Sequence, residues 1–180
     1  MMKWCDIDNG LKYIALRYFN VAGAYYDGSI GEDHNPETHL IPLILQVPLG
    51  KRDHLTIYGD DYPTRDGTCI RDYVQIEDLT AAHVLALKRL LDGGESEIFN
   101  LGSEEGYSVK EMVKAVEEVT GQKVKVQIGA RRAGDPAVLI ASSKKAREVL
   151  GWKPKFNNVK DIISSAWKFH RLHPNGYQDK

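Results

Sequence analysis

One stretch decides the fold: Tyr13-Ile-Ala-Leu-Arg-Tyr-Phe-Asn-Val-Ala-Gly-Ala24. It is a nearly continuous apolar run that ends in a turn of small residues, a pattern typical of a parallel strand buried on both faces. In open α/β sheets, ligands bind beyond the carboxyl ends of such strands. Arg17, Asn20 and the turn at 21–24 are therefore predicted to lie at a ligand site. The alternative is a plain core strand whose asparagine starts a turn.

The rest of the chain alternates between strand and helix patterns, which predicts an α/β protein. Apolar spacing, caps and glycine stops indicate where each element lies. We expect further strands at 55–58, 73–76, 97–101 and 124–128, and helices at 40–47, 77–91, 108–121, 142–151 and about 159–166. Two long polar loops, 25–39 and 59–71, are of a length that is usually functional or disordered.

Bulk composition restricts the function class. The chain has 180 residues, 42% of them hydrophobic, and a net charge of −1, which suits one domain or a piece of a larger one. No basic block favours binding to nucleic acid or a membrane surface. Two cysteines, no apolar run of membrane-spanning length and no signal-peptide core predict a cytoplasmic protein. Because so few residues precede the first strand, the chain is expected to be a fragment of a larger fold.

The sharpest polar motif is Arg131-Arg-Ala-Gly-Asp135. Paired guanidiniums beside a glycine suit a diphosphate, because arginine offers planar, bidentate and permanently charged donors. Asp135 is expected either to orient an arginine or to accept sugar hydroxyl groups, and the alternative is a solvated turn with a local ion pair. Arg71 lies at the mouth of a predicted strand, after a loop long enough to cover a ligand. Its alternative role is to anchor that loop.

Groups for catalysis and metal binding are sparse. His34 and His39, with Asp33 and Glu37 nearby, show no recognised ligand spacing, so no metal site is predicted. No G-x-G-x-x-G motif follows a strand, and no tyrosine has a lysine four residues later. The sequence therefore predicts no catalytic residue in this chain.

The residues resemble the C-terminal half of the UDP-glucose 4-epimerase family, in the extended short-chain dehydrogenase/reductase group. The resemblance covers essentially the whole chain, and its most particular part is the Gly-Asp-Asp-Tyr-Pro-Thr stretch with the His-Pro-Asn-Gly-Tyr tail. The matching segments are 16–24, 39–42, 55–64, 66–68, 71–73, 78–79, 100–102, 131–135 and 173–177.

This resemblance implies an α/β fold: the C-terminal part of an NAD-binding Rossmann-like domain plus the smaller UDP-sugar-binding domain. Residues 1–24 and 70–102 would complete the NAD-domain sheet, and residues 25–69 and 103–180 would bind substrate. It also implies an NAD-dependent enzyme that interconverts UDP-galactose and UDP-glucose, in which the cofactor carries the hydride. The complete enzyme is expected to be a homodimer, and this chain alone is expected to be inactive.

The resemblance also implies a set of site residues. Phe19 and Tyr18 would lie at the NAD site. Arg71 and Arg132 would hold the diphosphate, and Asp135 the ribose or nearby groups. The remaining substrate-binding positions would be Asn20, His39, Leu40, Thr56, Ile57, Tyr58 and Leu139.

Two departures from the family pattern bear on the substrate range. His39 stands where some bacterial members carry a sugar-facing asparagine. Leu139, or Val138 if the alignment slips by one, stands where some members have a bulky tyrosine, so an acetamido group at C2 would fit. The alternatives are a UDP-N-acetylglucosamine 4-epimerase, another extended short-chain dehydrogenase, or, from a different class, a non-catalytic nucleotide-sugar-binding module.

Overall fold

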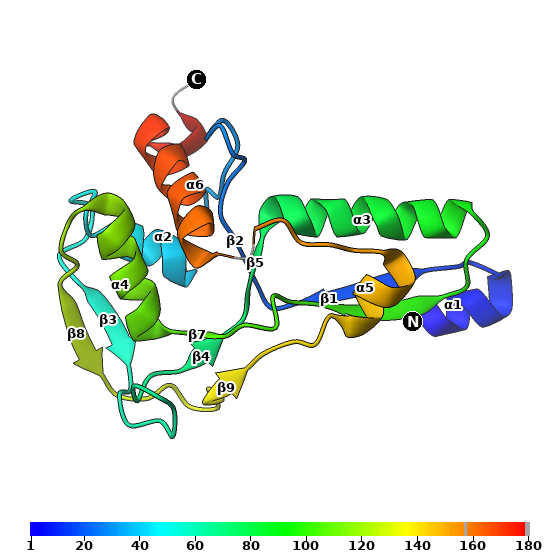
Figure 1. Cartoon of the computed structure of the whole chain (residues 1–180), viewed down its shortest axis with the longest axis horizontal. Coiled ribbons are helices and arrows are strands. Elements are labelled where there is room, and N and C mark those ends of the chain that lie inside the picture. Colours follow the sequence, from blue (N-terminus) through cyan, green and yellow to red (C-terminus); the bar gives the residue numbers. More distant parts are fainter. Residues whose placement is uncertain (157, 179–180) are drawn as a thin grey trace.

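The computed structural model describes residues 1–156 and 158–178 and shows an α/β protein with short, mainly parallel strands (Figure 1). The helices of the described residues are α1 (Met2–Asn9), α2 (Leu40–Leu45), α3 (Ile76–Leu91), α4 (Val109–Thr120), α5 (Lys144–Leu150), α6 (Val159–Leu172) and the 3-10 turn η1 (Gly176–Gln178). The strands are β1 (Ile14–Tyr18), β2 (Asn20–Ala22), β3 (Leu55–Tyr58), β4 (Ile70–Arg71), β5 (Tyr73–Gln75), β6 (Glu97–Leu101), β7 (Tyr107–Ser108), β8 (Val126–Gly129) and β9 (Val138–Leu139).

One lobe is built on β1 and β6, which pair in parallel with Ile14 opposite Glu97. Helices α3 and α5 pack against this pair (Figure 1). The lobe has its own core, closed by Trp152, whose indole N–H donates to the carbonyl of Asp78 at 2.8 Å. The buried members of this core are Val74, Leu79, Ala82, Phe99, Leu101, Ala146, Leu150 and Trp152.

The other lobe is built on the parallel pair β3 and β8, with α2, α4 and α6 beside it (Figure 1). Helix α4 starts at a capping box, as its sequence predicts: Glu111 N–H donates to Ser108 Oγ at 3.1 Å, and Ser108 N–H donates to Glu111 Oε2 at 2.8 Å. Gly121 ends the helix with φ 69°. The apolar faces of α2, α4 and α6 meet in the second core.

Short strands join the two lobes. β2 pairs with β5 in parallel, while β4 lies between β7, which is antiparallel to it, and β9, which is parallel. In Figure 1, β2 and β5 lie between the two lobes. The chain therefore passes between the lobes close to the carboxyl ends of β1 and β2, where the sequence predicts a ligand site.

One expectation about the deciding stretch is wrong. β1 was expected to be buried on both faces, yet Arg17 and Tyr18 are exposed and the rest of the strand is half-buried. Within the described residues β1 has one strand neighbour, β6, so its other edge is unpaired. Its C-terminal residues, Arg17 and Tyr18, are left exposed by the other described elements. The run also divides in two, since β1 ends at Tyr18 and β2 begins at Asn20.

The predicted division at 1–24 and 70–102 against 25–69 and 103–180 stays a prediction. Most residues of each core come from one of the two predicted parts. Helix α5 and Trp152, however, come from the second group and pack in the core of the first.

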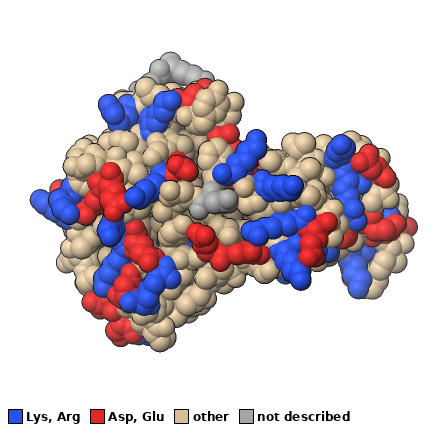
Figure 2. Space-filling view, in the orientation of Figure 1, with Lys and Arg blue, Asp and Glu red and all other residues tan. Residues whose placement is uncertain are grey.

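The surface carries charges of both signs. On the face shown in Figure 2, lysine and arginine lie interspersed with aspartate and glutamate over both lobes. Within residues 1–156 and 158–178, no helix is both long enough and apolar enough to cross a membrane.

Candidate functional site

A polar cavity of about 240 Å³ opens where β2, β3 and β4 approach the start of α2. We call it the polar cavity. Nine of the ten predicted substrate-binding residues line it, although they come from five separate segments of the chain. They are Asn20, His39, Leu40, Thr56, Ile57, Tyr58, Arg71, Arg132 and Asp135.

Arg71 and Asp135 form the most buried ion pair of this cavity. Arg71 Nη2 lies 2.5 Å from Asp135 Oδ1, and the Arg71 side chain is only 14% exposed. Arg71 Nη1 also donates to the carbonyl of Ile70 at 2.8 Å. Asp135 thus orients the guanidinium, one of the two roles left open by the sequence, and an oriented guanidinium is a donor for an anion in the cavity.

The adjacent arginines of the predicted diphosphate motif separate in the structure. Arg132 lines the polar cavity with its guanidinium 3.9 Å from the centre of the Tyr58 ring. Arg131 instead binds the 59–71 loop: its Nε lies 2.6 Å from Asp61 Oδ1, and its guanidinium lies 4.3 Å from the Tyr62 ring centre. The Arg131 guanidinium beside Asp61 lowers the pKa of that carboxyl. Only Arg132 of the two is therefore placed for a ligand in the cavity.

Asp72 lies in the chain between Arg71 and Tyr73, two residues that line the cavity. This fully buried carboxylate accepts hydrogen bonds from Ser103 N–H at 2.8 Å, Ser103 Oγ at 2.7 Å and Ala141 N–H at 3.0 Å. Its backbone carbonyl accepts a hydrogen bond from Asn20 Nδ2 at 2.9 Å. One residue therefore joins β4 and β5 to two distant segments and holds the side chain of Asn20 in place.

A second cavity, of about 540 Å³, adjoins the first and is lined mainly by aromatic and aliphatic side chains. We call it the aromatic cavity. Tyr18 and Phe19, the predicted cofactor residues, lie in its wall, and each is 42% exposed. Large apolar side chains exposed in a concave surface are typical of a site that binds a planar ligand ring or a further protein segment. Val21, Ala22, Glu32 and His39 line both cavities, so ligands bound in the two would meet at these residues.

The segment at this junction gathers four ionisable side chains. Glu32, His34, Glu37 and His39 bring one donor atom each within 4.8 Å of the others. Burial, and after it the charge of Glu37, raise the pKa of Glu32. Asp33, which the sequence singled out instead of Glu32, lies apart and accepts a hydrogen bond from the backbone N–H of Tyr177 at 2.9 Å.

Leu139 is the exception among the predicted substrate-binding residues, because it does not line the polar cavity. It lies on β9, opposite Arg71 of β4. β9 is the outer strand of the β7-β4-β9 sheet, and Arg71 lines the cavity whereas Leu139 does not. Its role beside the sugar stays a prediction.

Sequence reasoning missed five lining residues with side chains of chemical interest. In the sequence, Arg52 resembles a surface charge in a turn, and Cys69 and Tyr73 resemble core residues. Glu32 and Thr38 lie in the polar loop at 25–39, which carries no motif. Only the length of that loop indicated a functional role. The five are Glu32, Thr38, Arg52, Cys69 and Tyr73.

The residues at the aromatic cavity fit one end of a dinucleotide. The rings of Tyr18 and Phe19 offer a surface for a planar nicotinamide, whereas the glycine-rich cradle that holds a pyrophosphate is not in this sequence. Bound NAD would supply hydride transfer, while this chain would supply one wall for its ring.

Comparisons with known proteins agree with this geometry. The family described as "GDP-mannose 4,6 dehydratase" matches residues 1–165. The UDP-glucose 4-epimerase of Lacticaseibacillus casei is 57% identical over all 180 residues, which cover 54% of that protein. The chain therefore spans about half the length of the curated relatives that it matches.

Solved structures show the same fold. A crystal structure of a UDP-glucose 4-epimerase superposes with a TM-score of 0.96 at 57% identity, over 99% of this chain and 54% of that one. The UDP-glucose 4-epimerase of Bifidobacterium longum, solved in complex with NAD⁺ and UDP, gives a TM-score of 0.90 at 36% identity, over 97% of this chain and 52% of that one. The Rossmann-like fold of the extended short-chain dehydrogenase/reductase group is confirmed, and the chain belongs to the GDP-mannose 4,6 dehydratase family, within which it is similar to the UDP-glucose 4-epimerases.

Proposed function

We propose that this chain provides the UDP-sugar pocket of an NAD-dependent UDP-glucose 4-epimerase, which interconverts UDP-galactose and UDP-glucose. The observation that carries the proposal is the contact between the two cavities. Three arginines line the polar cavity, three exposed aromatic side chains (Tyr18, Phe19 and Tyr25) line the aromatic cavity, and four residues line both. A hydride can pass between a sugar and a nicotinamide only when the two are held in contact.

The polar cavity suits the UDP part of the substrate. Arg71 and Arg132 would bind the diphosphate by charge-assisted hydrogen bonds, and Thr56, Ile57 and Tyr58 would surround the uracil. Asp135 would hold Arg71 in place and lie near the ribose.

The sugar would then point towards the junction of the cavities. His39 and Leu40 would contact it there, with Asn20 on the opposite wall, and C4 would face the nicotinamide beside Phe19 and Tyr18. The protons of the reaction would be handled outside this chain, because the Tyr-x-x-x-Lys arrangement of the group is not in its sequence.

The division into an NAD-domain part (1–24 and 70–102) and a substrate-binding part (25–69 and 103–180) belongs to the same proposal. So do a homodimeric complete enzyme, a cytoplasmic location and the absence of nucleic-acid partners. A net charge of only −1 and charges of mixed sign on the visible face support the last point (Figure 2).

A chimaera tests the proposal. The chain would be fused behind the part of the Lacticaseibacillus casei enzyme that it does not match, and conversion of UDP-galactose to UDP-glucose would be measured. We expect conversion, with kcat/KM reduced at least tenfold by Arg132→Ala. Arg131→Ala is the matched control and should have little effect, because Arg131 binds Asp61 outside the cavity. A folded, NAD-loaded chimaera without conversion would refute the proposal and favour a non-catalytic nucleotide-sugar-binding module.

A further inference from the structure

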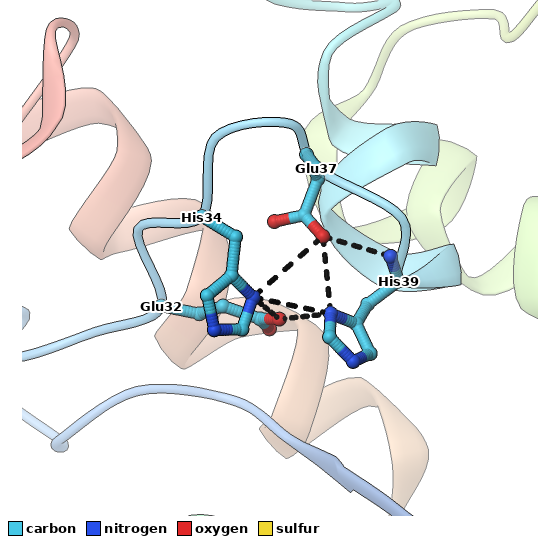
Figure 3. Close-up of side chains that lie close together, drawn as sticks. All are labelled: Glu32, His34, Glu37 and His39. Atoms are coloured by element: carbon cyan, nitrogen blue, oxygen red, sulfur yellow. Dashed lines mark hydrogen bonds and ion pairs between the residues drawn. The ribbon is translucent and has the colours of Figure 1, made fainter.

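The loop from Glu32 to His39 brings two imidazoles and two carboxylates around one point (Figure 3). His34 Nδ1 and His39 Nδ1 lie 3.2 Å apart. Glu32 Oε1 lies 3.1 Å from the first of these nitrogens and 2.7 Å from the second. Glu37 Oε1 lies 4.0 Å and 3.1 Å from the same two atoms. We propose that these four side chains form a binding site for a divalent transition-metal ion of the Zn²⁺ type.

The spacing fits a tetrahedral ion. Zn²⁺ binds histidine nitrogen and carboxylate oxygen at about 2.0–2.2 Å, which separates the ligand atoms of a regular tetrahedron by about 3.4 Å. Five of the distances between the donor atoms are 2.7–4.0 Å, so these distances would change by at most about 0.7 Å when an ion enters. Two histidines and a glutamate also recur as the protein ligands of zinc enzymes.

Charge and burial favour a cation here. The Glu32 and Glu37 side chains are only 17% and 8% exposed, whereas the two imidazoles are about half exposed. Among the residues that the structure describes, no lysine or arginine makes an ion pair with either carboxylate. Two largely buried carboxylates therefore face an opening lined by two imidazoles, an arrangement that suits a divalent cation.

The loop is held in this shape before any ion binds. Glu37 Oε1 accepts the backbone N–H groups of Thr38 and His39, both at 2.7 Å, which fixes this carboxylate. Tyr177 holds the other side of the loop, since its hydroxyl accepts from Gly31 N–H at 2.9 Å and its own N–H donates to Asp33. Contacts of this second layer orient metal ligands and strengthen binding.

The ligand set also selects the ion. Two nitrogen and two oxygen donors suit Zn²⁺ and Co²⁺, whereas Mg²⁺ and Ca²⁺ prefer oxygen alone. Glu32 and His39 line both cavities, His34 lines the aromatic cavity and Glu37 lines neither, so the ion would sit in the loop that borders the cavities. The site does not depend on the proposed epimerase activity, so it is tested by metal binding alone.

The test is a titration of the 180-residue chain with Co²⁺, followed by visible absorption, and then displacement by Zn²⁺. We expect one equivalent of Co²⁺ with the intense absorption of a four-coordinate ion. His34→Ala and Glu32→Gln should each weaken binding at least tenfold. His83→Ala is the control, because His83 is exposed on α3 and its ring contacts the carbonyl of Leu79.

Far-ultraviolet circular dichroism shows whether each variant keeps the native fold. Glu32→Gln preserves the size of the side chain, so it carries the test if His34→Ala unfolds. The proposal is overturned if the wild-type chain shows no saturable one-to-one binding, if His34→Ala and Glu32→Gln bind as tightly as wild type, or if His83→Ala weakens binding to the same degree.

Discussion

The polar and aromatic cavities share four lining residues but differ in how their walls are held. In the polar cavity, Arg71 is paired with Asp135, Arg132 stacks on Tyr58, and Asn20 donates to the backbone of Asp72. In the aromatic cavity, the rings of Tyr18 and Phe19 are 42% exposed. In the polar cavity, contacts within this chain hold the side chains that would bind a ligand. In the aromatic cavity, this chain provides one wall of exposed rings. Organised donors bind an anion without a further ordering cost, so we expect the chain to bind the UDP part of a ligand by itself.

The largest expected effect concerns the frame of the polar cavity. Asp72→Ala removes the acceptor of two backbone N–H groups, on Ser103 and Ala141, in a fully buried position. Each donor left without a partner costs about 1–3 kcal/mol, so urea unfolding should show a loss on the order of 2–6 kcal/mol. Asp72→Asn keeps one carbonyl oxygen and should lose less. Asp53→Ala, at an exposed position, is the control and should change stability by less than about 0.5 kcal/mol. Equal stability of Asp72→Ala and wild type would show that this frame does not hold the cavity.

The next effect concerns the ligand contacts of the polar cavity. Arg71→Ala should weaken UDP and UDP-glucose alike by about 1.5–3 kcal/mol, because a charge-assisted contact to the diphosphate is lost. Arg71→Lys should not restore binding in full, since lysine lacks the planar fork. Calorimetry that found UDP binding unchanged and UDP-glucose binding weakened would place the arginine at the sugar instead.

A smaller effect should appear in the loop at 59–71, which contributes Cys69 and Arg71 to the polar cavity. Arg65 Nε donates to Glu111 Oε1 at 2.6 Å and so lowers the pKa of Glu111 below its ordinary value of 4.5. A lowered pKa in the folded state stabilises the fold above that ordinary value, and the contribution disappears as the pH falls through the lowered pKa.

Glu111→Gln should therefore cost less than about 1 kcal/mol at neutral pH, because both side chains are largely exposed and solvent screens the pair. The difference from wild type should shrink below about pH 4.5. Thermal unfolding across a pH series measures it. If the stability difference between Glu111→Gln and wild type grew as the pH fell, the Arg65–Glu111 ion pair would not be its cause.

The smallest effect is expected in the aromatic cavity. Phe19→Ala should leave both UDP affinity and the stability of this chain within about 0.5 kcal/mol of wild type, because the ring is substantially exposed. In the NAD-loaded chimaera the same change should reduce cofactor retention. If Phe19→Ala weakened UDP binding as strongly as Arg71→Ala, the two cavities would not be separate in function.

Local signals carried most of the fold prediction. The capping box at Ser108 predicted the start of α4, and the apolar segment at 97–101 matches β6. The two-residue strands β4, β7 and β9 were missed, because so short a strand is defined by the neighbour that it pairs with and leaves no periodicity in the sequence. The burial of β1 was also misjudged, since an apolar run indicates what a strand could bury but not which neighbours cover it.

The candidate site shows a similar limit. Arginine chemistry pointed to the 131–135 motif, but Arg131 and Arg132 are adjacent and chemically identical, and only the fold shows that one binds Asp61 while the other lines the cavity. In the 25–39 loop the sequence singled out Asp33, whereas the folded loop brings Glu32 to the histidines. Such differences depend on loop geometry and on contacts between distant segments, which residue types and spacing do not encode.

Calorimetry of UDP binding to the 180-residue chain and to its Arg131→Ala and Arg132→Ala variants tests the central claim most directly. We predict one UDP per chain, weaker binding of UMP because it lacks the second phosphate, a loss of about 1.5–3 kcal/mol in Arg132→Ala, and unchanged affinity in Arg131→Ala. Equal losses in the two variants, or equal affinity for UDP and UMP, would contradict the claim that the polar cavity binds a nucleoside diphosphate through Arg132.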